Sequence, residues 1–339
     1  MGLDERKAKI LSSIVEDYIS SAEPVGSKTI SQKYNNEFSP ATIRNEMKLL
    51  EDDGYLEQPH ISAGRIPSTK GYRYYVDNLM KDKKLSMIEI NYINNSITGY
   101  GDTEGLLEQA ATTVSKILER PTILTISNSD ILEKIKILRI SENILLVILV
   151  SQNGVIKDCI AKISNTIPDN VVEELNNMLN VNLKGTPIED LYNVLNLVIT
   201  KELKGFSNIL AQICQSIKYE LSRSNKNIKN NVESILDLPE FSDIDKARDF
   251  INLISTKQII DNTLQVIPDK KLSIIIGNEN KEVLLKDYSI ISLNIVDNKK
   301  MKSSLSIISP KRIDYSKTVS TLKYINGKMR NLFINPKKQ

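Results

Sequence analysis

The sequence predicts a mixed α+β protein with more than one domain, and three observations lead to that class. A chain of 339 residues exceeds the usual size of one domain. Residues 1–80 combine helical periodicity with a basic, turn-rich loop, which predicts an N-terminal winged helix-turn-helix. Beyond it, β-branched runs flank a helical block at about 168–224, which predicts one sheet interrupted by an insertion.

The first 34 residues predict two helices joined by a turn. Asp4 is suited to cap the first helix, whose apolar side is formed by Ile10, Leu11, Ile14, Val15 and Tyr18. The turn is Glu23-Pro24-Val25-Gly26. We expect Ser27 to cap a short second helix that reaches Tyr34 and buries Ile30.

A third helix follows, and its exposed face is suited to reading DNA. Ser39 is a good N-cap, and Pro40 occupies the first helical position, where its missing N–H does no harm. Ile43, Met47 and Leu50 share one buried face, and Gly54 ends the helix. Arg and Lys can bind guanine edges and Asn can bind adenine in a major groove. The candidate base-reading residues are Ala41, Thr42, Arg44, Asn45 and Lys48.

The segment from Gln58 to Tyr75 predicts the wing, because it contains no acidic residue and can lie against a phosphate backbone. Gly64 is expected to let the chain turn at the tip. An ordinary polar hairpin is the alternative, and the preceding capped helix favours the wing. The candidate DNA-backbone contacts are His60, Arg65, Lys70 and Arg73, and Ser39 and Ser62 complete the candidate DNA-binding residues. Arg73 has a second possible role, since it can pair with Asp77 at i+4.

The remaining elements are predicted from periodicity and turn signals. A helical segment to about Ile97 and a second amphipathic helix stopped by Pro121 precede the first strand. Asn153-Gly154 is a strong hairpin signal between two strands. The predicted strands are 122–126, 135–140, 144–150, 155–163, 272–276, 290–296 and 305–308, and a final helix spans about 315–332.

Long sequence motifs resemble the heat-inducible transcription repressors of the HrcA family. The N-terminal ones are EPVGSKT (23–29), PATIRNEM (40–47) and PHISAGRIPSTKGYRYYVD (59–77). Near the C-terminus, IGNEN (276–280), DYS (287–289) and PKRIDY (310–315) also match in order. The chain departs from the family pattern at three positions, with Ile61 for a usual Thr, Ser309 for Gly and Ile313 for Met.

The resemblance implies a domain order and a function. The domains would be a winged helix at 1–80, a helical linker at 81–104, a discontinuous GAF-like domain at 105–164 and 241–339, and an inserted dimerising domain at 165–240. The implied protein is a repressor that binds double-stranded DNA as a homodimer, at the inverted-repeat operator of chaperone operons. The chaperonin GroEL would keep it active, and heat would divert the chaperonin to unfolded proteins.

We expect the dimer contacts in the helical block at 165–240. Its helices carry apolar stripes such as Ile209, Ile213, Ile217 and Leu221, more than one packing layer needs. The alternative is that these stripes are all internal core.

The sequence lacks the residues that a metal site, an enzyme active site or a membrane span would need. His60 is the only histidine, and Cys159 and Cys214 are far apart, so we predict two buried reduced thiols and no metal site, cofactor or catalytic residue. The longest apolar run, Ile144–Val150, is too short to cross a bilayer, and no signal peptide is evident, so a cytoplasmic location is expected. The alternative function is a repressor gated by a small ligand in its GAF-like domain.

Charge is distributed unevenly along the chain. Residues 298–339 contain eleven Lys or Arg and one acid, although the net charge of the whole chain is only +3. DNA binding by the N-terminal region must therefore depend on a local patch and not on bulk charge. For the basic C-terminal stretch we considered two readings, a solvated helix face and a second electropositive surface for DNA or an acidic partner.

Overall fold

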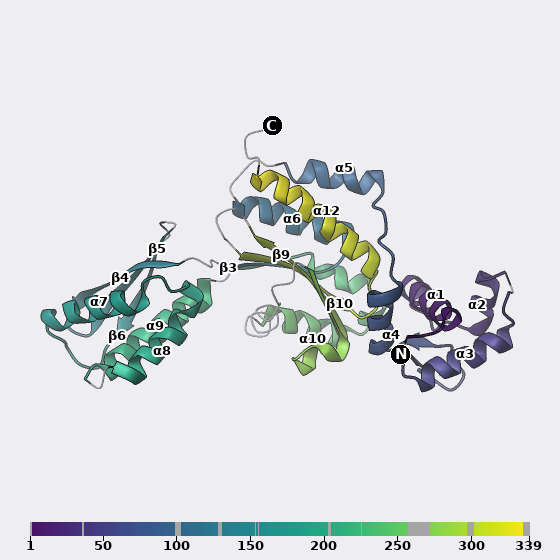
Figure 1. Ribbon diagram of the computed structural model, residues 1–339, viewed down its shortest axis with the longest axis horizontal. Coiled ribbons are helices and arrows are strands. Elements are labelled where there is room, and N and C mark those ends of the chain that lie inside the picture. Colours follow the sequence, from purple (N-terminus) through teal and green to yellow (C-terminus); the bar gives the residue numbers. More distant parts are fainter. Residues whose placement is uncertain are drawn as a thin grey trace. The chain divides into compact units, whose positions relative to one another are not determined.

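The chain forms a mixed α+β structure, as predicted (Figure 1). The computed structural model describes residues 2–35, 37–98, 103–127, 131–152, 154, 156–202, 205–224, 226–256, 272–296 and 302–334. The chain divides into two compact units. Unit 1 comprises Met1–Leu124, Ile228–Ile295 and Ser304–Gln339, and unit 2 comprises Thr125–Asn227 and Val296–Ser303.

Unit 1 begins with a small helical segment, residues 4–79, which we call the N-terminal module. Its elements are α1 (Glu5–Ser21), α2 (Ser27–Lys33), α3 (Pro40–Asp52), β1 (Leu56–Glu57), β2 (Ile66–Pro67), α4 (Thr69–Tyr74) and a π-helical turn (Tyr75–Leu79). Asp4 caps α1, because its carboxylate accepts a hydrogen bond of 2.9 Å from the Lys7 N–H. The predicted cap of α2 was wrong by one residue. Gly26 occupies the N-cap, and Ser27 is buried in the first turn.

The rest of unit 1 is built on a five-stranded sheet in the order β7-β3-β10-β9-β8. The strands are β3 (Thr122–Ser127), β7 (Lys226–Asn230), β8 (Leu272–Ile276), β9 (Tyr288–Val296) and β10 (Lys302–Pro310). In Figure 1, α6 (Thr103–Leu118) and α12 (Tyr315–Ile334) cover one face, and α10 (Ile244–Ser255) covers the other. Phe250 and Ile254 of α10 join Ile290 and Ile308 of the strands in one buried cluster. Neither β7 nor α10 was predicted.

Helix α12 holds the segment that follows the N-terminal module through ion pairs and hydrogen bonds, which we call the α12 tie. This segment contains α5 (Met87–Ser96), which contacts α6. The ion pairs and hydrogen bonds of this tie are Lys317–Glu89 (2.9 Å), Lys323–Asp82 (2.8 Å), Lys83–Asp314 (3.0 Å) and Lys328 Nζ to the Asn94 carbonyl (2.9 Å). Lysines of the basic C-terminal stretch therefore act as intramolecular partners of the linker, a role that differs from both readings of the sequence.

Glu89 makes this tie sensitive to acid. The Glu89 carboxylate accepts a hydrogen bond from the Ser86 N–H at 2.8 Å and pairs with Lys317. These contacts, the Ser86 bond first, lower the pKa of Glu89 from 4.5 to about 2. A lowered folded-state pKa gives stability that is present above pH 4.5 and is lost as the pH falls toward 2.

We therefore expect the free energy of unfolding of the native chain to exceed that of Glu89→Gln above about pH 5. The difference should shrink steadily between pH 4.5 and 2. Chemical denaturation across this range measures the difference, and Glu173→Gln, in the helix at 169–183, controls for the loss of one exposed carboxylate. A constant difference at every pH would contradict the assignment.

Unit 2 contains a separate three-stranded antiparallel sheet in the order β4-β5-β6. Its elements are β4 (Leu132–Ser141), β5 (Ile144–Ser151), β6 (Ile156–Lys162), α7 (Asp169–Leu183), α8 (Leu191–Glu202) and α9 (Ser207–Ser224). Helices α7 and α9 pack on the sheet, and α8 packs on α9 (Figure 1). The predicted hairpin of β5 and β6 is present, and Gly154 has a φ of +79° between the two strands.

The boundaries of unit 2 differ from the predicted insertion at 165–240. Strands β4–β6 were assigned to the first sheet, but they pair only with one another among the described strands. Their inward side chains, such as Ile135 and Val147, share one core with α7–α9. Residues 228–240 belong to unit 1 instead, where Ile235 is fully buried in the other core. Short turns let adjacent strands pair locally, which is the physical reason for a separate sheet.

The apolar stripes of α9 are used within this core. Ile213 and Ile217 are fully buried, and Ile209 and Leu221 pack against the same cluster. The internal-core alternative is therefore correct for these residues, and their stripe is not a free surface.

The two cysteines are free and buried, Cys159 on β6 and Cys214 on α9. Burial raises the pKa of each thiol to about 11. Across the described part of the chain, His, Cys, Asp and Glu form no group of three suited to a metal ion. Within the same residues, no helix is long and apolar enough to cross a membrane.

Candidate nucleic-acid interface

Helix α3 presents a fixed and largely exposed face. The Ser39 side chain accepts a hydrogen bond of 3.1 Å from the Thr42 N–H, so it caps the helix as predicted, with Pro40 at the first position. Ile43, Met47 and Leu50 are buried against the module. The helix therefore has one anchored face, and the opposite face is free to meet a partner.

The predicted base-reading residues lie on that opposite face. Ala41, Arg44, Asn45 and Lys48 are exposed, and Thr42 is half-buried. The Thr42 hydroxyl also forms a hydrogen bond of 2.9 Å with the Ser39 hydroxyl, so Thr42 takes part in the cap of α3. Within the residues that the structure describes, no ion pair or side-chain hydrogen bond engages Arg44, Asn45 or Lys48.

The loop between β1 and β2, residues 58–65, is ordered by its own hydrogen bonds. The Gln58 amide donates to the carbonyls of Ile61 (2.9 Å) and Ala63 (3.0 Å). At its base, Arg65 and Val25 exchange two backbone hydrogen bonds of 2.9 Å. The tip carries His60, Ile61 and Ser62, all exposed. The loop is therefore a preformed projection, fixed to the turn between α1 and α2.

Gly64 has a different role from the predicted one. It is not among the residues of positive φ, so it does not supply a left-handed turn at the tip. A Cβ atom at position 64 would lie 2.4 Å from the Val25 carbonyl oxygen and 2.8 Å from that of Pro24. Only glycine allows these two backbone segments to approach so closely.

Two predicted backbone contacts, Arg65 and Lys70, are occupied within the module. The Arg65 guanidinium pairs with Glu51 of α3 at 2.8 Å, and its side chain is only 16% exposed. Lys70 donates at 2.7 Å to the Asp53 carbonyl at the end of α3, and it lies over the Tyr55 ring. Arg65 therefore braces the loop against α3, and Lys70 braces α4 against the end of α3.

Arg73 lies on α4, outside the loop, and its side chain is engaged within unit 1. Its guanidinium forms a bidentate pair with Glu279, donates to the Ile274 carbonyl (2.7 Å) and pairs with Asp77 at i+4 (3.2 Å). These contacts, the Glu279 hydrogen bond first, raise the pKa of Arg73. Arg73 thus fastens α4 to β8 and the turn after it.

The same junction contains further contacts between the N-terminal module and the sheet part of unit 1. Gly277, with a φ of +54°, packs on Thr69, where an added Cβ would lie 2.5 Å from the threonine hydroxyl. The buried rings of Tyr72 and Tyr315 are 5.7 Å apart. The stretches IGNEN and PKRIDY, singled out in the sequence, therefore lie where the module is held.

Two further exposed residues of the module were not among the predicted site residues. Lys28 is exposed in the first turn of α2, and no ion pair holds it among the described residues. The sequence feature that could have indicated it is its position in the motif EPVGSKT, at the start of the helix that precedes the predicted recognition helix. Ile61 is fully exposed, at 102%, on the loop tip. No pattern in one sequence distinguishes such a residue from a core isoleucine.

Comparison with known proteins identifies the family. The family described as HrcA protein C terminal domain matches residues 104–319. The heat-inducible transcription repressor HrcA of Thermoanaerobacter pseudethanolicus is 34% identical over 98% of this chain and 97% of that protein. The repressor of the same name from Ruminiclostridium cellulolyticum is 36% identical over 97% of both chains. A crystal structure described as a hypothetical protein aligns with a TM-score of 0.62 and 23% identity, over 99% of this chain and 100% of that one.

These matches cover nearly the whole chain. The chain belongs to the HrcA family, which is a family of transcription repressors and not of enzymes.

Proposed function

We propose that this chain is a cytoplasmic, heat-inducible repressor that binds the inverted-repeat operator of chaperone operons as a homodimer. The observation that carries the DNA-binding part is the exposed, unpaired face of α3 beside the acid-free loop 58–65. The chaperonin GroEL keeps the repressor active in this proposal, and that part rests on family membership alone.

In this proposal the N-terminal module is a winged helix-turn-helix, α3 is its recognition helix, and loop 58–65 is its wing. Arg44, Asn45 and Lys48 face the base edges of the major groove, where they can discriminate guanine and adenine. His60 and Ser62 approach the sugar–phosphate backbone from the wing tip. Lys28 meets a phosphate from α2, the helix that crosses the backbone in this motif.

The remainder of unit 1 is the GAF-like domain of this proposal, and unit 2 is the dimerising domain. An inverted-repeat site requires a protein with two-fold symmetry. Because the α9 stripes are internal, we assign the dimer contact to the open face of the β4–β6 sheet. The apolar residues of this face are Leu138, Ile140, Leu146, Ile148, Val150, Ile156 and Ile160.

The exposure of this face argues for a partner. Leu138 is 40% exposed and Ile160 is 61% exposed, although strands of small proteins usually turn polar residues outward. Pairing at the β4 edge is blocked, because the amides of Asn176 and Asn180 bond the backbone N–H and C=O groups of Ile137 and Ile135. The proposal therefore places the contact on the face and not at the β4 edge.

The face is also self-complementary. One row across the three strands reads Lys136, Ile148 and Asp158, and the next reads Leu138, Leu146 and Ile160. A two-fold axis parallel to β5 would place β4 of one subunit over β6 of the other. Each lysine of the first row would then face the opposite carboxylate, and the apolar row would meet its own counterpart.

We expect Asn45→Ala to lose sequence discrimination. If the Asn45 amide makes a bidentate base contact, its removal should cost about 1–3 kcal/mol on the operator and little on random DNA. Fluorescence anisotropy with both DNAs at one salt concentration measures the difference. Asn94→Ala, on α5 outside the module, is the matched control. Equal losses on both DNAs would show that Asn45 does not read bases.

The whole proposal is tested by electrophoretic mobility shift with the full chain and a chaperone-operon inverted repeat, with and without GroEL. Binding of the inverted repeat in preference to a scrambled repeat supports the operator assignment. A larger active fraction in the presence of GroEL supports chaperonin dependence. No preference for the inverted repeat would overturn the proposed function.

A further inference from the structure

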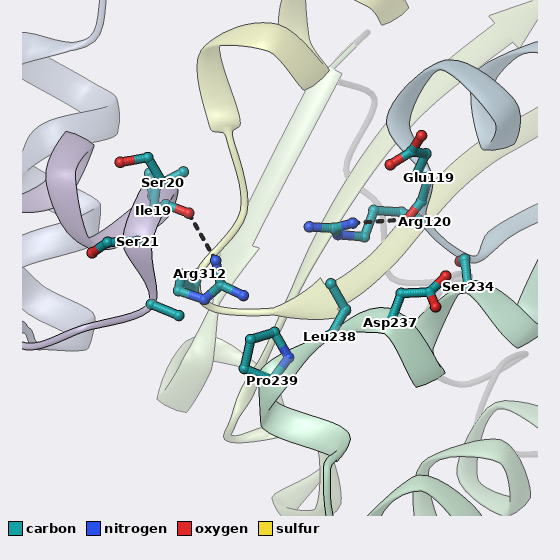
Figure 2. A pocket seen from close by; sticks show the side chains of 11 residues that line it. Ile19, Ser20, Ser21, Glu119, Arg120, Ser234, Asp237, Leu238, Pro239 and Arg312 are labelled. Atoms are coloured by element: carbon teal, nitrogen blue, oxygen red, sulfur yellow. Dashed lines mark hydrogen bonds between the residues drawn. The ribbon is translucent and has the colours of Figure 1, made fainter.

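Unit 1 contains a cavity of about 380 Å³ beside the C-terminal end of α1 (Figure 2). One wall is Ile19–Ala22 of the N-terminal module, and the opposite wall comes from the segment before β3 and from residues 234–239. Two arginines, Arg120 and Arg312, line it from different elements. In Figure 2 the Arg120 side chain extends into the space toward Arg312.

The two arginines differ in how their hydrogen-bond donors are satisfied. Arg312 pairs with Glu240 through two hydrogen bonds of 2.6 and 3.0 Å, and it donates to the Ile19 carbonyl at 2.7 Å. Arg120 donates once, to the carbonyl of its neighbour Glu119 at 2.7 Å, and its Nε is buried without a partner. Within the described residues, no carboxylate forms an ion pair with Arg120.

The incomplete hydrogen bonding of Arg120 lowers the stability of the folded chain. The half-buried guanidinium has lost part of its hydration and has gained no carboxylate at ion-pair distance within the described residues. Burial lowers the pKa of Arg120 and the charge of Arg312 lowers it further, while the charges of Glu240 and Glu119 raise it and offset only part of this shift. A bound anion would relieve both effects, and the planar guanidinium fork fits an oxyanion.

We propose that this cavity is a binding site for a small oxyanion, a carboxylate or a phosphate, with Arg120 as its anchor. Arg312 adds positive potential, while its own donors stay on Glu240 and Ile19. Glu119 and Asp237 also line the cavity and are exposed. Their carboxylates disfavour large polyanions, so a compact ligand with one anionic group fits best.

The position of the cavity indicates what a bound ligand would do to unit 1. Occupancy would touch both the end of α1 and the segment before β3, so it would brace the N-terminal module against the sheet part of the same unit. An effect on operator affinity rests on the proposed function, whereas binding of the anion does not.

The test uses thermal unfolding of the full chain without DNA. Sodium phosphate and sodium acetate are titrated separately, each against sodium chloride at matched ionic strength. We expect one of them to raise the Tm in a saturable manner, because a ligand that binds only the folded state stabilises it by mass action. The two arms distinguish a phosphate site from a carboxylate site.

Arg120→Gln should raise the apparent Kd at least tenfold and leave the ligand-free Tm equal or higher, since it removes an uncompensated charge and keeps a donor for the Glu119 carbonyl. Arg248→Gln, an exposed arginine paired with Asp245 on α10, should behave like the native chain. Saturable stabilisation by neither anion, or equal stabilisation of Arg120→Gln, would overturn the site. A ligand-free Tm several degrees lower in Arg120→Gln would also overturn it, by making Arg120 a structural brace.

Discussion

Ile160→Asp is expected to convert the dimer to a monomer and to weaken operator binding by about 10²–10⁴-fold. In the proposed two-fold arrangement, Ile160 meets Leu138 of the partner subunit, and a carboxylate there would be buried without a counterion. Loss of the dimer removes the avidity of two linked half-site contacts, which sets the size of the effect. Sedimentation equilibrium and mobility shift measure the two consequences on the same preparation.

Val181→Asp supplies the matched control, because Val181 is an exposed apolar residue of the same unit but lies on α7. It should remain dimeric and bind the operator as the native chain does. Since Ile160 is 61% exposed, its replacement should leave the unfolding of the monomer nearly unchanged. A dimeric Ile160→Asp, or a monomeric Val181→Asp, would move the dimer contact away from the sheet face.

Local chemistry made much of the fold predictable. Ser39 and Pro40 determine where α3 begins, and their effect depends only on the next few residues. The turn at Gly154 likewise fixes the β5–β6 pairing without any distant contact. The exposed positions of α3 followed from helical periodicity, since Ile43, Met47 and Leu50 had to be inside.

The intramolecular partners of two candidate DNA contacts were not predictable, because they come from other elements of the chain. Arg73 is basic and near the wing in sequence, but its main partner Glu279 is 206 residues away. Arg65, another candidate contact, pairs with Glu51 of α3. Side-chain type gives the charge of these arginines but not the carboxylate that neutralises it.

The assignment of strands to sheets failed for the same reason. The β-branched composition identified β3–β6 as strands, but it carries no information on which strands pair. The polar strand β7 (Lys226–Asn230) gave no signal at all, because it lies at the edge of its sheet. The apolar stripe of α9 was visible in sequence, while the layer that covers it was not.

Gly64→Ala is expected to displace the wing and to weaken binding to every DNA sequence. The new Cβ would lie 2.4 Å from the Val25 carbonyl oxygen, so the paired backbone hydrogen bonds of Val25 and Arg65 cannot keep their length of 2.9 Å. Overpacking of this kind costs about 1–3 kcal/mol, and the obstacle here is backbone, which cannot rotate away. Anisotropy with operator and random DNA, together with chemical denaturation, measures the loss of affinity and of stability.

Gly205→Ala is the control, because a Cβ at Gly205 meets nothing within 4 Å and its φ is not positive. This variant should match the native chain in both measurements. The comparison separates loop 58–65 from α3. Gly64→Ala should reduce affinity for operator and random DNA alike, because the loop meets the DNA backbone in the proposed complex. Asn45→Ala should reduce operator affinity selectively. If Gly64→Ala bound both DNAs as tightly as the native chain, loop 58–65 would lie outside the interface, and α3 would have to position itself on DNA without it.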